Sequence, residues 1–393
     1  MIHRVVKSVY RSNLRKIAIL GWYGDFNVGN DAILLGILAS LKSVMPDNDF
    51  ITFSWHPKLT ARRYGVKTFP YYKFFQFVPK VDALLVGGGT LLTDWQLALP
   101  LFLFLALAIG WAKVLGNPVM LYAVGAEPFS TRTGRFLART ILNRVDLITV
   151  RGNRSKRFLE KLGVSKPIHV TVDLALVLQP LDNGGAKGIL KREGISEVGN
   201  PRVVVCLRHC NGTEGVKLKH VIAEVCDYLA ENFGAEVVFL PMSTSVYDDD
   251  RKIMAEALEM MKNRGRVKFI TDRLTPQETM IIIGLSSVVV SMRLHPLIFA
   301  AATHTPMIAL VGRINHFVPQ SNNKISEFME MISRQSWIFN YENLHTNDLL
   351  SKIETLLAAS QPRNRLTLNV ETLKETCFNN SELIEKTILL RIT

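Results

Sequence analysis

Short apolar runs rich in valine, isoleucine and leucine recur along the chain, and most are followed by a turn and a segment typical of a helix. Strands of a parallel sheet are covered on both faces and are therefore continuously apolar. The repeated order of strand and helix thus predicts an α/β fold with doubly wound sheets. The predicted strands span residues 16–21, 50–54, 81–86, 119–125, 146–151, 168–173, 202–207, 235–240, 267–271, 287–291 and 306–311.

The pattern breaks once and then restarts, with a polar, glycine-containing stretch over residues 181–200 between the two series of strands. The length of 393 residues also exceeds what one hydrophobic core usually supports. We therefore expect two Rossmann-like domains facing a cleft, as in GT-B-type transferases. The expected domains are residues 1–180 and 201–330, joined by a linker at 181–200, with a mainly helical extension over 331–393.

The formal charge of +13 indicates a surface that attracts anions. Phosphorylated small molecules and anionic lipid headgroups both satisfy this charge. The sequence contains neither a basic low-complexity tail nor an aromatic platform for single strands, which argues against nucleic acid. The 48% of hydrophobic and 21% of charged residues are typical of a globular protein rather than a disordered one.

The four cysteines form no CxxC pair and no metal-like cluster with histidine. Free, mostly buried thiols in a reducing compartment are the simplest interpretation. Residues 1–15 include Lys7, Arg11 and Arg15 but no apolar core of a secretory signal, so we expect a cytoplasmic protein.

The most apolar segment, residues 97–112, is shorter than the roughly 20 residues that a membrane span needs. A buried helix is one interpretation, and an interfacial helix that dips into one leaflet is the other. The aromatic segment at residues 71–78, with lysines at or near both ends, also suits either a core edge or a membrane interface.

Two candidate cations and an imidazole follow predicted strands directly. Arg293 and His295 come after residues 287–291, and Arg208 comes after residues 202–207. Ligands bind at the carboxyl ends of strands in open α/β sheets, so these side chains predict a phosphate or carboxylate site. In the alternative interpretation, Arg293 pairs with a neighbouring carboxylate and His295 caps the following helix.

A glycine-containing loop, residues 22–31, follows the first predicted strand and leads into an apolar helix over residues 32–41. Such a strand, loop and helix can receive an anion or a sugar on the loop amides. The GxGxxG fingerprint of dinucleotide binding is absent. Gly24 and Gly29 permit positive φ or close approach of a ligand, although plain turn formation explains either equally well.

Three consecutive glycines, at positions 87 to 89, follow the strand predicted for residues 81–86. They place bare backbone against a bound ligand or against a closely packed helix. The triplet from Asp248 to Asp250 is open to two interpretations as well. It could bind a metal, but adjacent carboxylates at a helix start more often complement the helix dipole.

These motifs, taken in order, resemble the polysaccharide pyruvyl transferase family over roughly residues 16–330. The resemblance lies in the ordered set rather than in any single motif. The set comprises Tyr23-Gly24, Asn27-Val28-Gly29-Asn30-Asp31-Ala32-Ile33-Leu34, Gly87-Gly88-Gly89, Ile148-Thr149-Val150-Arg151 with Ser155, Leu162-Gly163-Val164, Pro241-Met242 with the following aspartates, and Met292-Arg293-Leu294-His295.

Two positions depart from the family pattern. Family members commonly have Gly-Asp-Glu after the first glycine loop, where this chain has Gly29-Asn30-Asp31. A Tyr-Asp-Pro-Lys-like motif usually follows the last strand, where this chain has Gly312-Arg313-Ile314-Asn315-His316, with a lysine only at Lys324. Either Lys324 or Arg313 would have to supply that cation.

The resemblance implies transfer of the enolpyruvyl group of phosphoenolpyruvate to two hydroxyls of a sugar, which forms a cyclic pyruvate ketal and releases phosphate. The acceptor would belong to a surface polysaccharide or its lipid-linked precursor. Phosphoenolpyruvate is then a co-substrate, and neither a cofactor nor a metal is required. A lipid-linked acceptor, the basic charge and the two apolar segments together suggest peripheral contact with an anionic membrane at the inner face of the plasma membrane.

The resemblance also implies roles for individual residues. His295, Arg293, Asp31 and Glu127 are the catalytic candidates, with His295 as proton donor and the carboxylates as bases for the acceptor hydroxyls. The substrate-binding candidates are Arg208, Arg293, His295, Arg151, Lys324, Gly24, Asn27, Asp25, Gly88 and Gly89.

Two other functions fit the same residues. A GT-B glycosyltransferase would place the diphosphate of a nucleotide sugar on the same cations. A non-catalytic protein that binds anions or glycans could share the fold without turnover.

Overall fold

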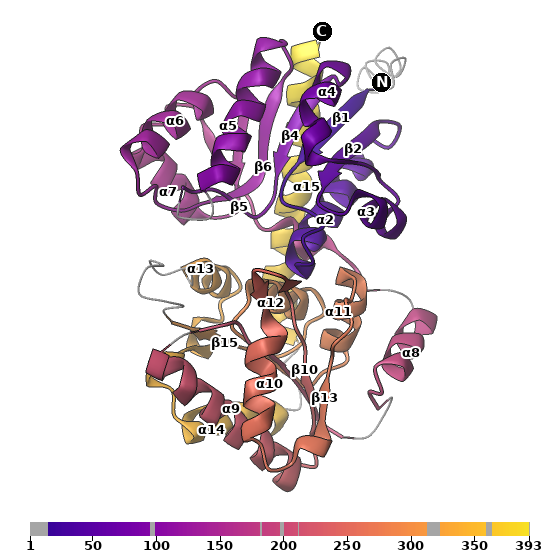
Figure 1. Cartoon of the computed structure of the whole chain (residues 1–393), viewed down its shortest axis with the longest axis vertical. Helices are drawn as coiled ribbons and strands as arrows, with labels where there is room; N and C mark the ends of the chain where they lie inside the picture. Colours follow the sequence, from indigo (N-terminus) through magenta and orange to yellow (C-terminus); the bar gives the residue numbers. More distant parts are fainter. Residues whose placement is uncertain are drawn as a thin grey trace. The chain divides into compact units, whose positions relative to one another are not determined.

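The computed structural model describes residues 15–94, 99–180, 183–196, 200–210, 212–312, 323–358 and 364–392. The chain forms two compact units (Figure 1). Unit 1 comprises Met1–Asp25, Ile33–Leu174 and Glu375–Thr393, and unit 2 comprises Phe26–Ala32 and Ala175–Lys374.

Unit 1 contains a parallel sheet in the order β3-β2-β1-β4-β6-β7-β8, with β5 paired to β6. The chain extends this sheet first on one side of β1 and then, from β4 onward, on the other. The topological switch point therefore lies between β1 and β4. The strands are β1 (Lys16–Leu20), β2 (Asp49–Ser54), β3 (Lys67–Pro70), β4 (Ala83–Gly87), β5 (Thr90–Leu92), β6 (Val119–Ala126), β7 (Leu147–Val150) and β8 (Ile168–Val170).

Helices cover both faces of this sheet. Side chains alternate between the faces along each strand, so these apolar strands present apolar side chains on both faces, and both must be buried. Leu121 belongs to the core that also contains Phe102 and Ile109 of α5. Tyr122 points to the opposite face, where its hydroxyl lies 2.6 Å from Ser381 Oγ of α15. The helical segments are α2 (Val28–Val44), α3 (Pro57–Tyr64), η2 (Tyr71–Lys73), α4 (Phe74–Phe77), η3 (Val78–Lys80), α5 (Leu99–Val114), α6 (Arg132–Leu142), α7 (Asn153–Lys161) and α15 (Asn364–Ile392).

Unit 2 repeats this architecture with a parallel sheet in the order β13-β10-β9-β14-β15-β16. Its switch point lies between β9 and β14. A short antiparallel hairpin pairs β11 with β12. The strands are β9 (Arg202–Cys206), β10 (Glu236–Phe239), β11 (Thr244–Ser245), β12 (Asp248–Asp249), β13 (Val267–Phe269), β14 (Val288–Ser291), β15 (Met307–Val311) and β16 (Ile338–Asn340).

The helices of unit 2 form two packed groups (Figure 1). In one group α10 and α14 pack against α9, and in the other α8 and α13 flank the pair α11 and α12. Both sheets are therefore doubly wound, which confirms the predicted fold class. The helical segments are η5 (Leu174–Val177), α8 (Asn183–Arg192), α9 (Gly212–Asn232), α10 (Asp250–Met260), η6 (Arg264–Arg266), α11 (Pro276–Gly284), α12 (Leu294–Ala302), α13 (Asn323–Met331), η7 (Gln335–Trp337), η8 (Tyr341–Asn343) and α14 (Thr346–Ala358).

The boundaries of the units differ from the expected domains in three ways. Residues 26–32 belong to unit 2, because their backbone is hydrogen-bonded to the loop after β10. The stretch expected to be a linker contains α8. The expected helical extension is divided, since β16 and α14 belong to unit 2 and the end of α15 belongs to unit 1.

Five short strands were absent from the sequence prediction, namely β3, β5, β11, β12 and β16. The prediction that residues 306–311 form the last strand of the second series is wrong, because β16 pairs in parallel with β15. The four cysteines are free and buried, as predicted.

Candidate functional site

Unit 2 brings the predicted cations together at its topological switch point. Strands β9 and β14 are neighbours, and Cys206 pairs with Ser291 at their carboxyl ends. Arg208 follows β9 by two residues, and Arg293 and His295 follow β14. Because ligands of open α/β sheets bind at this point, the cluster occupies the position that favours an anion site.

Arg293 is the centre of a buried ion-pair network. It occupies the N-cap position of α12, and only 11% of its side chain is exposed. Its guanidinium contacts Asp250 through two nitrogens, with Nε donating to Oδ2 at 3.2 Å, and it lies 2.8 Å from Asp248 Oδ2. The interpretation of Arg293 as the partner of a neighbouring carboxylate therefore describes its position in the structure.

Asp250 is held from two sides, since it also accepts hydrogen bonds from the backbone nitrogens of Met242 at 3.1 Å and Ser243 at 3.0 Å. The side chain is fully buried. Burial raises the pKa of Asp250 above its ordinary value, and the opposing effect of the Arg293 guanidinium does not cancel this rise. The carboxylate therefore depends on Arg293 for its charge compensation.

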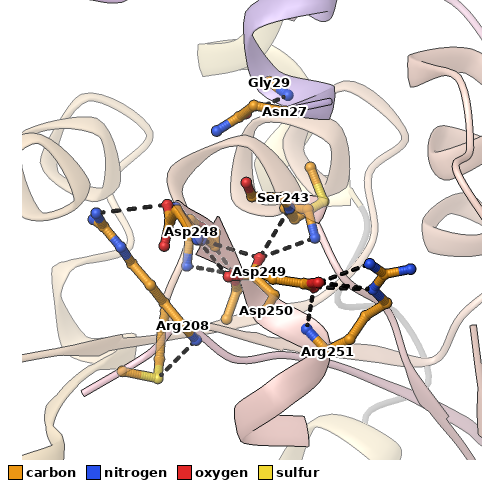
Figure 2. A network of polar contacts seen from close by, with 12 residues as sticks. Asn27, Gly29, Arg208, Ser243, Asp248, Asp249, Asp250 and Arg251 are labelled. Carbon is orange, nitrogen blue, oxygen red and sulfur yellow. Dashed lines mark hydrogen bonds and ion pairs between the residues drawn. The ribbon is translucent and has the colours of Figure 1, made fainter. Parts of the chain in front are cut away.

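Asp248 joins Arg293 to Arg208, whose terminal nitrogen lies 3.8 Å from Asp248 Oδ2 (Figure 2). Burial alone raises the pKa of Asp248, but the guanidinium groups of Arg293 and Arg208 outweigh this effect and hold the pKa below its ordinary value. The Arg208 side chain is 28% exposed, compared with 11% for Arg293. Arg208 is therefore the more accessible of the two cations, and its contact with Asp248 is the looser one.

The middle aspartate of the triplet has a separate role. Asp249 is the N-cap of α10, and its carboxylate pairs with Arg251 at 2.7 Å (Figure 2). Among the described residues, no group of three or more His, Cys, Asp or Glu side chains gathers as a metal site. The interpretation of the triplet as helix-start carboxylates fits Asp249, whereas Asp248 and Asp250 belong to the arginine network.

The loop after β1 contributes to the same unit. Val28 donates its backbone N–H to the Met242 carbonyl at 2.8 Å, and Thr244 donates to the Phe26 carbonyl at 3.0 Å. Asn27 forms an isolated antiparallel bridge with Ser243. These bonds fix the loop beside the backbone that also binds Asp250.

Gly29 packs directly against the imidazole of His295. A Cβ atom added to Gly29 would lie 2.0 Å from His295 Nδ1 and 2.4 Å from Cε1. The Gly29 backbone nitrogen donates to Asn27 Oδ1 at 3.0 Å, which closes a turn at the start of α2 (Figure 2). Asp31, two residues further along α2, is 8% exposed. Gly29 is therefore needed for close approach of the backbone to His295, rather than for a positive φ.

We expect Gly29→Ala to lower turnover roughly tenfold to a hundredfold, because the added methyl group must displace the His295 ring or the loop. The matched control is Gly188→Ala in α8, where a Cβ meets no atom within 4 Å. Alanine is favoured over glycine in helices, so propensity alone would stabilise both variants. Steady-state rates of the two variants provide the comparison, and equal rates would refute the steric constraint.

Six predicted site residues lie in unit 1, where they surround the switch point between β1 and β4 or line the neighbouring strand ends. Two of them have clear packing roles. Gly24 has φ +70° and its carbonyl oxygen lies 2.7 Å from His56 Nδ1. At Gly88, φ is +78° and a Cβ would lie 1.8 Å from Ile33 Cγ2 of α2. The interpretation of the triple glycine as a site of close helix packing therefore holds for Gly88.

Arg151 is also engaged within unit 1. Its guanidinium pairs with Asp173 at 2.7 Å and donates to Thr90 Oγ1 at 2.8 Å. Of the other residues predicted from the sequence, Gly89 has φ +71°, Asp25 follows β1 and Glu127 follows β6. In unit 2, Lys324 is the second residue of α13, whereas Arg313 lies outside the described residues.

Sequence reasoning missed an aromatic cluster at the carboxyl ends of β1, β2 and β3. Trp22 and Trp55 have ring centroids 4.9 Å apart, and Tyr71 lies 5.0 Å from Trp55. The Tyr71 hydroxyl donates to the Gly21 carbonyl at 2.8 Å and accepts from the Tyr23 amide at 2.9 Å, which fixes the ring. The signal in the sequence was an aromatic residue within two positions of the end of each strand.

The fold is similar to that of several solved structures. One is a glycosyltransferase from Rickettsia africae, with a TM-score of 0.61 and 12% identity over 96% of this chain and 99% of that chain. Another is UDP-N-acetylglucosamine 2-epimerase from Rickettsia bellii, with a TM-score of 0.60 and 12% identity over 97% of each chain. A third is ADP-heptose lipopolysaccharide heptosyltransferase II from E. coli, with a TM-score of 0.53 and 15% identity over 87% and 98%. The TM-scores establish a shared GT-B-like fold, and identities this low say nothing about the reaction.

A comparison with curated proteins found no match in sequence. The sequence profile of the family described as polysaccharide pyruvyl transferase matches residues 27–312, which make up most of the chain and include the arginine network and the switch point of unit 2. The chain therefore belongs to the polysaccharide pyruvyl transferase family.

Proposed function

We propose that this protein transfers the pyruvyl group of phosphoenolpyruvate to two hydroxyls of a sugar and releases phosphate. Membership of the family supports a transferase that acts in polysaccharide synthesis. The observation that carries the donor assignment is the cluster of Arg208, Arg293 and His295 at the switch point of unit 2.

Phosphoenolpyruvate carries a phosphate and a carboxylate, and Arg208 is the cation best placed to bind one of them. Its contact with Asp248 is 3.8 Å long and partly exposed, so an incoming anion can replace Asp248 as its partner at small cost. Arg293 then has a supporting role, because it keeps Asp248 and Asp250 in place and adds positive potential. The backbone N–H groups at the start of α12 supply further donors for the same anion.

His295 is the proposed proton donor. Protonation of the methylene carbon turns it into a methyl group and leaves an oxocarbenium-like centre at the adjacent carbon. A sugar hydroxyl attacks that centre and loses its proton to a carboxylate, for which Asp31 is the candidate beside Gly29. Attack by a second hydroxyl forms the other carbon–oxygen bond of the ketal and breaks the bond between that carbon and the phosphate oxygen. The departing phosphate takes the proton of this hydroxyl. Imidazole suits the first step, because histidine side chains titrate near neutral pH.

The proposed acceptor is a sugar of a surface polysaccharide or of its lipid-linked precursor. Within unit 1, the cluster of Trp22, Trp55 and Tyr71 supports a stacking surface for a sugar ring, since aromatic faces next to polar groups are common in ligand sites. Trp55 is 50% exposed and can therefore contact a ligand. This scheme assigns no step to a metal or cofactor.

The test is an incubation of the purified protein with phosphoenolpyruvate and the acceptor glycan, with phosphate release and product mass as the two readouts. We expect phosphate release that depends on the acceptor, and a product that has gained one pyruvate ketal and loses it in mild acid. A parallel incubation with nucleotide sugars tests the glycosyltransferase alternative. Release of nucleotide without ketal formation would contradict the proposal, and binding without any turnover would identify a non-catalytic protein.

A further inference from the structure

The outward face of α5 consists of apolar residues and glycine. Large exposed side chains occur at Leu103, Leu107, Trp111 and Val114, with exposed fractions of 41%, 65%, 39% and 79%. Spacings of four, four and three residues place them on one side of the helix. The remaining exposed position between residues 101 and 114 is Gly110. A surface helix of a globular protein normally presents charged and polar residues there.

The opposite face of α5 is already used. Phe102, Leu105, Ala108, Ile109 and Ala112 are buried in the core of unit 1. The buried-helix interpretation is therefore right for half of the helix and leaves the outer stripe unexplained. Such a contiguous apolar stripe usually marks a protein or membrane contact.

Neighbouring segments extend this apolar surface. Helix α5 packs beside α4 and α6. The ring centroids of Phe75 in α4 and Phe104 in α5 are 6.1 Å apart. Exposed aromatic side chains occur on both sides, with Tyr72 81% exposed before α4 and Phe136 72% exposed on α6. We define the α5 face as the stripe Leu103, Leu107, Trp111 and Val114 together with Tyr72, Phe75 and Phe136.

The charged residues of α6 beside this face have a single sign. Helix α6 carries Arg132, Arg135 and Arg139 next to Phe136, at spacings of three and four residues that place them on one side, and all three are exposed. The sequences of α5 and α6 contain no Asp or Glu. An apolar stripe bordered by arginines complements a surface with an acyl layer beneath anionic headgroups.

We propose that the α5 face docks this protein on an anionic bilayer, with the stripe below the headgroups and the α6 arginines among them. None of the described helices is both long and apolar enough to cross a membrane, and α5 has 16 residues, so the contact is made parallel to the surface. This docking concerns the surface alone and does not depend on the proposed reaction, although a lipid-linked acceptor would use it.

The test is sedimentation with vesicles of phosphatidylcholine that contain phosphatidylglycerol, without phosphoenolpyruvate or glycan. We expect binding that weakens with added salt and is lost on pure phosphatidylcholine. Leu107→Ser with Val114→Ser should lower vesicle affinity at least about tenfold, because two mostly exposed side chains no longer enter the acyl layer. Arg135→Gln with Arg139→Gln should reduce binding and its salt dependence.

The matched control is Val216→Ser with Leu285→Ser, two apolar side chains of unit 2 that are 47% and 50% exposed. We expect this variant to bind vesicles like the unmodified protein. Binding that survives the α5 substitutions would overturn the proposal, and so would absence of binding to phosphatidylglycerol vesicles. A dimer that dissociates in the α5 variant without vesicles would identify the face as a contact between copies and would also overturn it. Because turnover is measured separately, failure of docking and failure of the proposed reaction are distinguishable.

Discussion

Replacing His295 by glutamine is expected to lower the rate of pyruvyl transfer by about 10²- to 10⁴-fold. Glutamine keeps a hydrogen-bonding side chain but cannot deliver a proton near neutral pH. The KM for phosphoenolpyruvate should change much less than kcat, because Arg208 and the α12 amides remain. The measurement is the initial rate of acceptor-dependent phosphate release as a function of pH. The limb of the profile that reports the protonated acid should disappear in the variant.

His220→Gln is the matched control, since His220 is an exposed histidine on α9 of the same unit. It should leave both kcat and the pH profile unchanged. A His295→Gln variant with an unaltered rate would remove the proposed acid and leave only an anion-binding role for the cluster. Loss of phosphoenolpyruvate binding with normal kcat at saturation would lead to the same conclusion.

Arg293→Met is expected to lower the free energy of unfolding by about 3–5 kcal/mol, because it leaves Asp250 without its cation. Asp250 is fully buried and its remaining described partners are backbone N–H groups. Chemical denaturation at neutral pH measures this loss. The control is Arg251→Met, which removes the neighbouring Arg–Asp pair with Asp249, whose arginine is 32% exposed, and it should cost about 1 kcal/mol or less.

The loss of unfolding free energy in Arg293→Met should increase with pH. Burial already raises the pKa of Asp250 above its ordinary value, and removal of Arg293 raises it further. A carboxyl with a raised folded-state pKa binds more protons in the folded state than in the unfolded state, so its contribution to stability falls as pH rises from about 4 through the raised pKa. The deficit of Arg293→Met should therefore be small near pH 4 and larger at pH 7. An equal deficit at both values would show that Asp250 is not the group responsible.

Local sequence patterns predicted the long strands and the helices between them, because buried parallel strands have a composition that few other segments share. They also placed Arg208, Arg293 and His295 at strand ends. The sequence did not show that β9 and β14 are neighbours. This followed only from the sheet order of the structure, in which the two strands pair although about 80 residues separate them. Short edge strands escaped prediction, since β3 and β16 are partly exposed and have only four and three residues.

The contacts that define the site could not be read from the sequence. The ion pair between Arg293 and Asp250 joins residues 43 positions apart. Likewise, Gly29 meets His295 only because the loop after β1 is hydrogen-bonded to the loop after β10. A glycine in a loop has many explanations, and the tertiary structure selects one of them.

Helix α15 is divided between the two units, because unit 2 ends at Lys374 and unit 1 resumes at Glu375. This division affects how the protein folds during synthesis. The sheet of unit 1 begins with β1, yet its face around Tyr122 is covered by residues after Glu375, including Ser381. During synthesis the amino-terminal sheet therefore emerges from the ribosome long before the helix that completes it. Until then Tyr122 and its apolar neighbours remain exposed to solvent. We therefore expect nascent unit 1 to depend on chaperones and to express poorly as an isolated amino-terminal fragment.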